Sequence, residues 1–247
     1  MRINLHLLVM IIIPDIHGRD FWEKPVKENL GKEHIIFLGD YLDPYDYEGI
    51  APWEVFPRFE DIVALKKENP EDVTLLLGNH DLHYLDGNLE GGRYDYIHGA
   101  RNKKFFLDNL ELFQMAYETE ISGKKYLFTH AGVMWGWLVA NRHLFGVIQP
   151  EEVCGKLNGF LQDKETWPKF FKALGDVSHA RWGPCKYGSM IWSDVDDWDD
   201  TFDELPDVYQ IFGHTQQETE PVIGKHFACL DCRRAFRLTE DGIKTCE

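Results

Sequence analysis

The fold of this chain is decided by IIIPDIHG at residues 11–18, IIFLGDYLD at 35–43 and TLLLGNHD at 74–81. Each segment is a short apolar run of β-forming residues, followed at once by residues that include Asp, His or Asn. Runs of this kind are typical of buried strands that end in loops. Three strand ends that carry metal-ligand residue types predict a dinuclear metal site at one edge of a sheet.

The segments between these runs have helix-like composition. Residues 19–30 precede Gly31, and residues 52–69 precede Pro70, so both stretches have a suitable stop. Strands that alternate with helices predict an α/β fold with a parallel core, in which ligands gather outside the carboxyl ends of the strands.

The rest of the chain is read in the same way. The sequence predicts a loop over 82–99, a helix over 101–112 and a hairpin over 114–129 around Ser122-Gly123. The remaining predictions are helices over 135–145, 151–162 and 167–174, a strand over 208–212 and closing strands within 220–238. The acidic run over 194–204 lacks the ordered spacing of a calcium loop and is interpreted as a solvated surface segment.

Length and charge limit the classes of function. The 247 residues, 44% of them hydrophobic, are enough for one large domain with a sizeable core. A formal net charge of -16 argues against extended nucleic acid as a partner, because binding to it depends on phosphate neutralisation by Lys and Arg. Small phosphorylated substrates stay open, because bound metal ions supply positive charge locally.

The cysteines and the N-terminus favour a cytoplasmic protein that does not bind membranes. The five cysteines are odd in number and unevenly spaced, unlike a secreted disulfide framework. The Cys229 and Cys232 pair lacks the second pair of a zinc ribbon and is expected in the core. Residues 5–13 are too short to span a bilayer and are interpreted as the first strand. Translation from Met10 instead of Met1 would keep that strand complete.

Two later strands end in the same manner, at His130-Ala131-Gly132 and at Gly213-His214. The ordered series of five motifs resembles the calcineurin-like metallophosphoesterase superfamily. Residues 39–43, 129–132 and 191–194 (IWSD) are most similar to the PPP-type serine/threonine phosphatases and their compact bacterial and phage relatives. The resemblance implies an α/β/β/α sandwich of two central mixed sheets flanked by helices. We expect one domain over 1–247, with a helical cap-like insertion at about 133–190.

The resemblance also implies a ligand set for two divalent metal ions, with Mn²⁺ as first choice and Fe or Zn²⁺ as alternatives. Gln216 stands where many members of the superfamily carry a further histidine, which agrees with the PPP-like pattern. The ligands implied for the two ions are Asp15, His17, Asp40, Asn79, His130 and His214, with Asp40 bridging both.

Catalytic residues follow from the same resemblance. Two ions would activate a shared water for in-line attack on phosphorus, with His80 as general acid and Asp43 holding its imidazole. Pro44 stands where PPP enzymes usually have a phosphate-binding arginine. Arg181 is expected to act as the phosphate clamp, and Arg93 and Arg101 are the alternatives.

The function predicted from these residues is a metal-dependent phosphomonoesterase. Its substrate would be a phosphoprotein or a phosphorylated small molecule. One alternative is a dinucleoside polyphosphate hydrolase or phosphodiesterase, in which Tyr41, Tyr45, Tyr47 and Trp53 could stack a base. A weaker alternative is a binding module with the same fold and no turnover.

Overall fold

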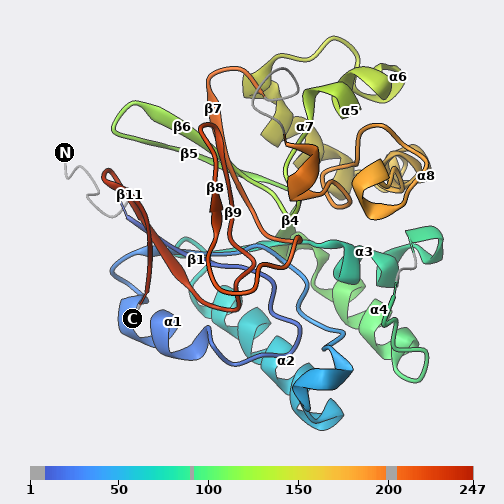
Figure 1. The fold of residues 1–247 in the computed structure, drawn as a ribbon. Coiled ribbons are helices and arrows are strands. Elements are labelled where there is room, and N and C mark those ends of the chain that lie inside the picture. Colours follow the sequence, from blue (N-terminus) through green and yellow to red (C-terminus); the bar gives the residue numbers. More distant parts are fainter. Residues whose placement is uncertain (1–8, 90–91, 199–204, 247) are drawn as a thin grey trace.

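The computed structural model describes residues 9–89, 92–198 and 205–246. Two mixed sheets lie against each other at the centre, and helices cover their outer sides (Figure 1). This is the predicted α/β/β/α arrangement. Expectations for residues 1–8, including the choice of start site, and for part of the acidic run lie outside the described residues.

The first sheet is built from the βαβ units that the sequence predicts. Its strand order is β11-β10-β1-β2-β3-β4, and β1, β2, β3 and β4 run parallel to one another. The strands are β1 (Met10–Ile13), β2 (His34–Phe37), β3 (Val73–Leu76), β4 (Phe113–Gln114), β10 (Phe236–Thr239) and β11 (Gly242–Thr245). The connecting helices are α1 (Glu23–Asn29) and α2 (Pro52–Glu68), followed by α3 (Asn79–Leu85) and α4 (Gly99–Asp108).

The second sheet has the order β5-β6-β7-β9-β8. It contains the predicted hairpin, β5 (Tyr117–Ile121) with β6 (Lys124–Phe128), and then β7 (Val208–Phe212), β8 (Val222–Ile223) and β9 (Phe227–Cys229). Because β6 and β7 are parallel, their carboxyl ends meet at the same edge. Cys229 and Cys232 are both buried, as expected for core residues.

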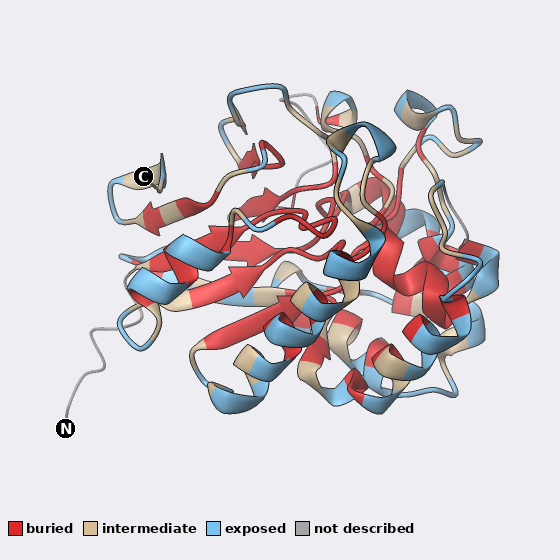
Figure 2. Ribbon diagram, turned by 90° about the horizontal axis from the view of Figure 1, so that it is seen from below, coloured by how far each residue is buried: buried red, intermediate tan, exposed pale blue. Residues whose placement is uncertain are grey.

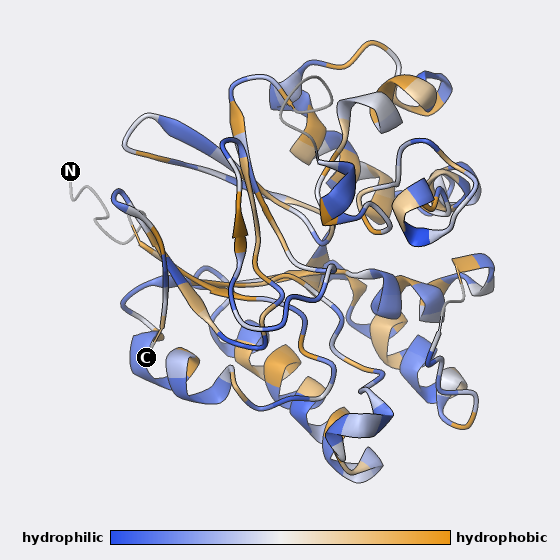
Figure 3. Cartoon of the chain, viewed as in Figure 1, coloured by the Kyte–Doolittle hydropathy of each residue, from blue (hydrophilic) through white to orange (hydrophobic). Residues whose placement is uncertain are grey.

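The central strands β1, β2 and β3 of the first sheet are buried at every position except His34, which explains why their sequences are continuous apolar runs rather than alternating ones. In β1, Ile11 and Ile13 pack in the cluster that includes residues of α1 and α2, whereas Met10 and Ile12 pack toward β6 and β7 of the second sheet. Figure 2 shows the central strands buried and much of the outer helix surface exposed, and Figure 3 shows the hydropathy of the same elements.

Four α-helices lie in the region predicted as a cap. They are α5 (Trp135–Ala140), α6 (Arg142–Phe145), α7 (Val153–Gln162) and α8 (Trp167–Leu174), gathered beside the second sheet in Figure 1. Whether this region is a separate insertion stays a prediction. Within the described part of the chain, no helix is long and apolar enough to cross a membrane.

The prediction of a loop over 82–99 is wrong at its start. Helix α3 begins at Asn79 and continues to Leu85, and its first turn is fixed by the Asp81 carboxylate. Asp81 accepts hydrogen bonds from the backbone N–H groups of Gly78, Asp40 and Tyr41 at 2.7 to 3.0 Å. These partners come mainly from another strand end, so the helix depends on tertiary contacts that the local sequence does not display.

Candidate metal centre

The predicted metal-ligand residues lie at the carboxyl ends of strands from both sheets. Asp15 and His17 follow β1, Asp40 follows β2, and Asn79 follows β3. The second sheet adds the remaining two, because His130 follows β6 and His214 follows β7.

The backbone at this edge is unusual. His17, Asp40, Asp43 and His214 all have positive φ angles, between 45° and 66°. Residues other than glycine adopt this left-handed conformation infrequently, and it concentrates at functional sites. The glycines of the motifs permit close approach, since a Cβ on Gly78 would lie 2.1 Å from Asp40 Oδ1, and one on Gly213 would lie 2.1 Å from Asp15 Oδ1.

Hydrogen bonds fix the direction of the histidine rings. His17 Nδ1 lies 2.9 Å from the Leu42 carbonyl, and His130 Nδ1 lies 2.9 Å from the Leu38 carbonyl. A carbonyl accepts only from a protonated nitrogen, so Nε2 of each neutral ring carries the lone pair. Both Nε2 atoms point to Asp40 Oδ2, at 3.4 Å from His17 and 3.5 Å from His130. This is the orientation that metal-binding histidines adopt.

Acceptor atoms face one another around Asp40. His130 Nε2 lies 2.9 Å from Asn79 Oδ1 and 3.1 Å from His214 Nδ1, and the buried His214 Nε2 has no hydrogen-bond partner. Burial raises the pKa of Asp40 well above its usual value, and the charge of Asp15 raises it further. Converging lone pairs and crowded carboxylates need a positive charge between them.

The structure contains two groups of possible ligand atoms that share Asp40: one with His17 and His80, the other with His130 and His214, with the atoms of each group within 4.8 Å of one another. Their donor set of carboxylate, imidazole and amide oxygen fits two divalent cations. Asp15 adjoins this set, because both of its carboxylate oxygens accept from the backbone N–H of His214, at 3.0 and 3.1 Å.

A second cluster forms around Asp43. This carboxylate contacts His80 Nδ1 at 3.0 Å and His83 Nε2 at 2.8 Å, and it accepts a short hydrogen bond from the Tyr84 hydroxyl. Burial would raise the pKa of Asp43, but the hydrogen bonds from His80 and His83 outweigh it and lower the pKa. The sequence placed Asp43 beside His80, and it missed His83 and Tyr84, since both fell in the segment interpreted as a loop.

His80 is a buried neutral imidazole in this arrangement. Burial lowers its pKa to about 4, and the hydrogen bond with Asp43 only partly offsets this effect. Its Nδ1 faces Asp43, and its Nε2 lies 3.0 Å from Arg93 Nη2, which donates to it. The ring is therefore held at both nitrogens.

Arg93 reaches the centre, whereas Arg101 does not. The Arg93 guanidinium donates to the Asp43 carbonyl at 3.0 Å, lies 3.4 Å from His17 Nε2 and stacks 3.5 Å from the centroid of the Tyr45 ring. Arg101 instead packs over the Phe56 ring at 3.8 Å and binds the side chain of Asn102. Of the two alternatives to Arg181, the structure brings only Arg93 to the ligands of the metal centre.

Arg181 lies at the His214 side of the centre. Its guanidinium donates to the His214 carbonyl at 3.1 Å and to Thr215 Oγ1 at 3.2 Å, and it pairs with Asp194 at 3.0 Å. Trp192, from the same IWSD segment as Asp194, packs edge-on against the His214 ring with the ring centroids 5.6 Å apart. The role of Arg181 as a phosphate clamp stays a prediction.

The aromatic residues that the sequence offered for base stacking are distributed unevenly. Tyr41 is fully buried and donates to the Leu76 carbonyl, so its ring cannot receive a ligand. One neighbour of the Tyr45 ring is the Arg93 guanidinium. Tyr47 and Trp53 are exposed, and the Tyr47 hydroxyl lies 3.0 Å from Arg233 Nη2.

Asp231 is a site residue that sequence reasoning missed. Its carboxylate is buried, its Oδ1 has no hydrogen-bond partner, and burial together with the charge of Asp15 raises its pKa well above the usual value. The residue comes shortly after β9, so it carries the same signal as the other strand-end acids. The sequence pattern draws attention only to the neighbouring Cys229 and Cys232.

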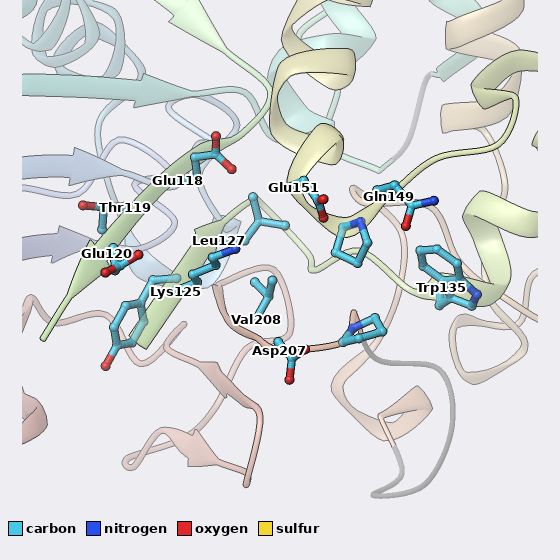
Figure 4. A pocket seen from close by; sticks show the side chains of 13 residues that line it. Glu118, Thr119, Glu120, Lys125, Leu127, Trp135, Gln149, Glu151, Asp207 and Val208 are labelled. Atoms are coloured by element: carbon cyan, nitrogen blue, oxygen red, sulfur yellow. The ribbon is translucent and has the colours of Figure 1, made fainter. Parts of the chain in front are cut away.

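A separate cavity of about 680 Å³ lies between the second sheet and the cap-like region (Figure 4). Its described lining includes Glu118 and Glu120 of β5, Lys125 of β6, Trp135 of α5 and Asp207. The proposed metal ligands are not among the described residues that line it, so this cavity is distinct from the metal centre.

Comparisons with known proteins agree with this geometry. A model of the calcineurin-like phosphoesterase family matches residues 8–218. The chain is 28% identical over 142 residues to a symmetrical bis(5'-nucleosyl)-tetraphosphatase of Paracidovorax citrulli, a match that covers 55% of this chain and 48% of that protein. The chain thus spans about half the length of this relative.

Two solved structures share the fold. A cold-active protein tyrosine phosphatase has a TM-score of 0.59 and 17% identity, with 97% of this chain and 78% of that chain covered. A protein serine/threonine phosphatase from Saccharomyces cerevisiae has a TM-score of 0.53 and 14% identity, with coverage of 99% and 81%. At these identities the likeness concerns the fold alone.

Proposed function

This chain belongs to the calcineurin-like phosphoesterase family, and we propose that it hydrolyses phosphate monoesters with two divalent metal ions. The observation that carries the proposal is the convergence of buried acceptor atoms from Asp40, Asn79 and His130, which a cation would satisfy. Mn²⁺ is the first candidate, with Fe or Zn²⁺ as alternatives, because this donor set suits all three. The proposed substrate is a phosphorylated small molecule or a phosphoprotein.

Each proposed ligand has a position consistent with its role. Asp15, His17 and Asp40 would hold the first ion. The second would be held by Asp40 together with Asn79, His130 and His214. Two ions bound there supply positive charge to phosphoryl oxygens and lower the pKa of a bound water.

Arg93 is the proposed phosphate-binding arginine. Its guanidinium lies between His17 and His80, so it adjoins both the first ion's ligands and the proposed general acid. A planar guanidinium matches two phosphate oxygens, and this one compensates for the arginine absent at Pro44. Arg181 would add a second positive charge from the His214 side.

His80 is the proposed proton donor to the leaving oxygen, and Asp43 orients its ring through Nδ1. With a pKa of about 4 the free imidazole is neutral near pH 7. Arrival of a negatively charged phosphate raises the pKa of a nearby imidazole. Protonation of His80 is therefore coupled to substrate binding, and Nε2 is the nitrogen that would face the substrate.

Metal reconstitution and a substrate panel test this proposal. The purified protein loaded with Mn²⁺ should hydrolyse a chromogenic phosphomonoester, and His80→Ala should lower kcat about 10²-fold or more while Mn²⁺ content stays unchanged. If the protein shows no metal-stimulated turnover of phosphomonoesters, phosphodiesters or dinucleoside polyphosphates, the binding-module alternative replaces the enzyme.

A dinucleoside polyphosphate hydrolase is the second candidate. The observation that favours it is the sequence match to the tetraphosphatase of Paracidovorax citrulli. The same panel separates the two candidates, since the preferred substrate is the one with the higher kcat/KM. We also propose a cytoplasmic location, which the five free cysteines support.

A further inference from the structure

We propose that Trp182 is a stacking surface for the base of a nucleotide substrate, a role that deepens the second candidate function and rests on it. The Trp182 side chain is 98% exposed, whereas Trp22, Trp137 and Trp198 are buried. Its backbone is in the left-handed conformation, with φ 61°, which is uncommon for a bulky residue. A large apolar ring held in an unfavourable backbone conformation and left in solvent points to a binding role.

The turn that carries Trp182 is firmly built. Its N–H donates to the His179 carbonyl at 3.0 Å, and Gly183 N–H donates to the Ser178 carbonyl at 2.8 Å. The backbone of Ser178 also forms an isolated β-bridge with the backbone of Cys185, which closes the turn. A Cβ on Gly183 would lie 2.2 Å from the Val177 carbonyl oxygen, so the chain after the indole is tightly packed. The base of the indole therefore has a defined position.

Arg181 connects this turn to the metal centre. Its guanidinium donates to the carbonyl of His214, a proposed ligand of the second ion, and to Thr215 Oγ1. Trp182 follows Arg181 directly in the chain, so the residue that carries the exposed indole adjoins one whose guanidinium is hydrogen-bonded to the centre. A substrate with phosphate at the ions and an aromatic group a few bonds away would meet both side chains.

A nucleobase is the aromatic group that fits this arrangement. In a nucleoside polyphosphate, the base is separated from the reacting phosphorus by ribose and further phosphates, and those phosphates carry charge toward Arg181. Every base has a π-face, so stacking on an indole is strong without requiring base-specific hydrogen bonds. The net charge of -16 disfavours a long polyanion but not such a small one.

The test compares a substrate that has bases with one that lacks them. With Mn²⁺-loaded protein, the measured quantity is kcat/KM for diadenosine tetraphosphate divided by kcat/KM for inorganic tripolyphosphate. Loss of one stacked base corresponds to a factor of about 5 to 150. We expect Trp182→Ala to lower the ratio about tenfold, mainly through the KM of the dinucleotide, and Trp182→Phe to restore most of it.

Val147→Ala is the control, because the Val147 side chain is apolar and 89% exposed, and no role at the metal centre is proposed for it. It should leave the ratio unchanged. An unchanged ratio in Trp182→Ala, or an equal fall in Val147→Ala, overturns the proposal. If the wild type turns over neither substrate, the second candidate function fails. Calorimetric binding of AMP to the wild type and to Trp182→Ala then decides the stacking role by itself, since equal affinities overturn it.

Discussion

Two clusters of buried Asp and His residues meet at this centre, and they differ in how their polar atoms are satisfied. In the Asp43 cluster (Asp43, His80, His83 and Tyr84), donors surround a carboxylate. In the Asp40 cluster (Asp40, Asn79, His130 and His214), acceptors face acceptors. In the first cluster three protein groups point at the Asp43 carboxylate, although His83 Nδ1 has no hydrogen-bond partner, whereas in the second the converging lone pairs need a cation. Under the proposed function, similar residue types would serve proton transfer in one cluster and metal binding in the other.

The division runs between neighbouring residues of one helix. Asn79 and His80 begin α3, and successive side chains on a helix point about 100° apart. Asn79 Oδ1 consequently reaches His130, while the His80 ring turns to Asp43. The helix N-terminus thus supplies one residue to each cluster.

The largest effect is expected from a substitution of Asp40, the carboxylate at the centre of the cluster that needs a cation. Asp40→Asn should abolish Mn²⁺ binding and lower kcat/KM about 10³-fold, because metal ions contribute several kcal/mol to the transition state. Wild-type protein should be stabilised by about 2.7 kcal/mol at Mn²⁺ concentrations about 100 times Kd, and the variant should lose that shift in Tm. The Tm of its metal-free form should not fall, since repulsion between buried carboxylates is relieved.

Asp43→Asn makes the same change in the other cluster and should give the opposite pattern. Its metal-free Tm should fall, because buried donors lose a charged acceptor at a cost of about 1–3 kcal/mol. The Mn²⁺-induced shift should remain. Calorimetry with and without Mn²⁺ measures both quantities, and similar behaviour of the two variants would contradict the division into two clusters.

A smaller effect is expected at Arg93. Arg93→Ala should lower kcat/KM for a phosphomonoester about tenfold or more, because a charged hydrogen bond to phosphate is worth roughly 1.5–3 kcal/mol. Arg101→Ala removes the same charge from a nearby position that packs on Phe56, and it should leave kcat/KM unchanged. Equal losses in the two variants would mean that overall charge, rather than contact at the centre, is responsible.

The smallest effect should come from Tyr84→Phe. The change removes one of the donors to Asp43 and leaves His80 and His83 in place. We expect a loss of about 1.5 kcal/mol in unfolding free energy and a severalfold lower kcat, with Mn²⁺ affinity unchanged. Denaturant unfolding and metal titration test this expectation, and a fall in Mn²⁺ affinity would show that the clusters are not separate.

Most of the fold could be predicted because its signals are local. The apolar runs over 10–13, 34–37 and 73–76 are strands with the expected polar ends, and α8 and β7 have the predicted bounds. Helix α3 could not be predicted, because Asp81 fixes its first turn through the backbone of another strand end. His83 and Tyr84 lie on this helix, so their contacts with Asp43 could not be predicted either. The position of Arg93 also depends on tertiary contacts.

The sequence by itself determined the strands, the order of the strand-end motifs and the residue types at the centre. These features can be recognised because hydrophobic patterns, turn residues and metal-ligand residue types each occur within short stretches of sequence. Only the tertiary structure decided which lone pairs converge, which donors complete Asp43 and which arginine reaches the ligands. Those outcomes depend on side-chain directions set by packing between segments far apart in the chain, as in the contact of His130 with Asn79 across 51 residues. Satisfaction of buried polar groups is a property of the assembled site.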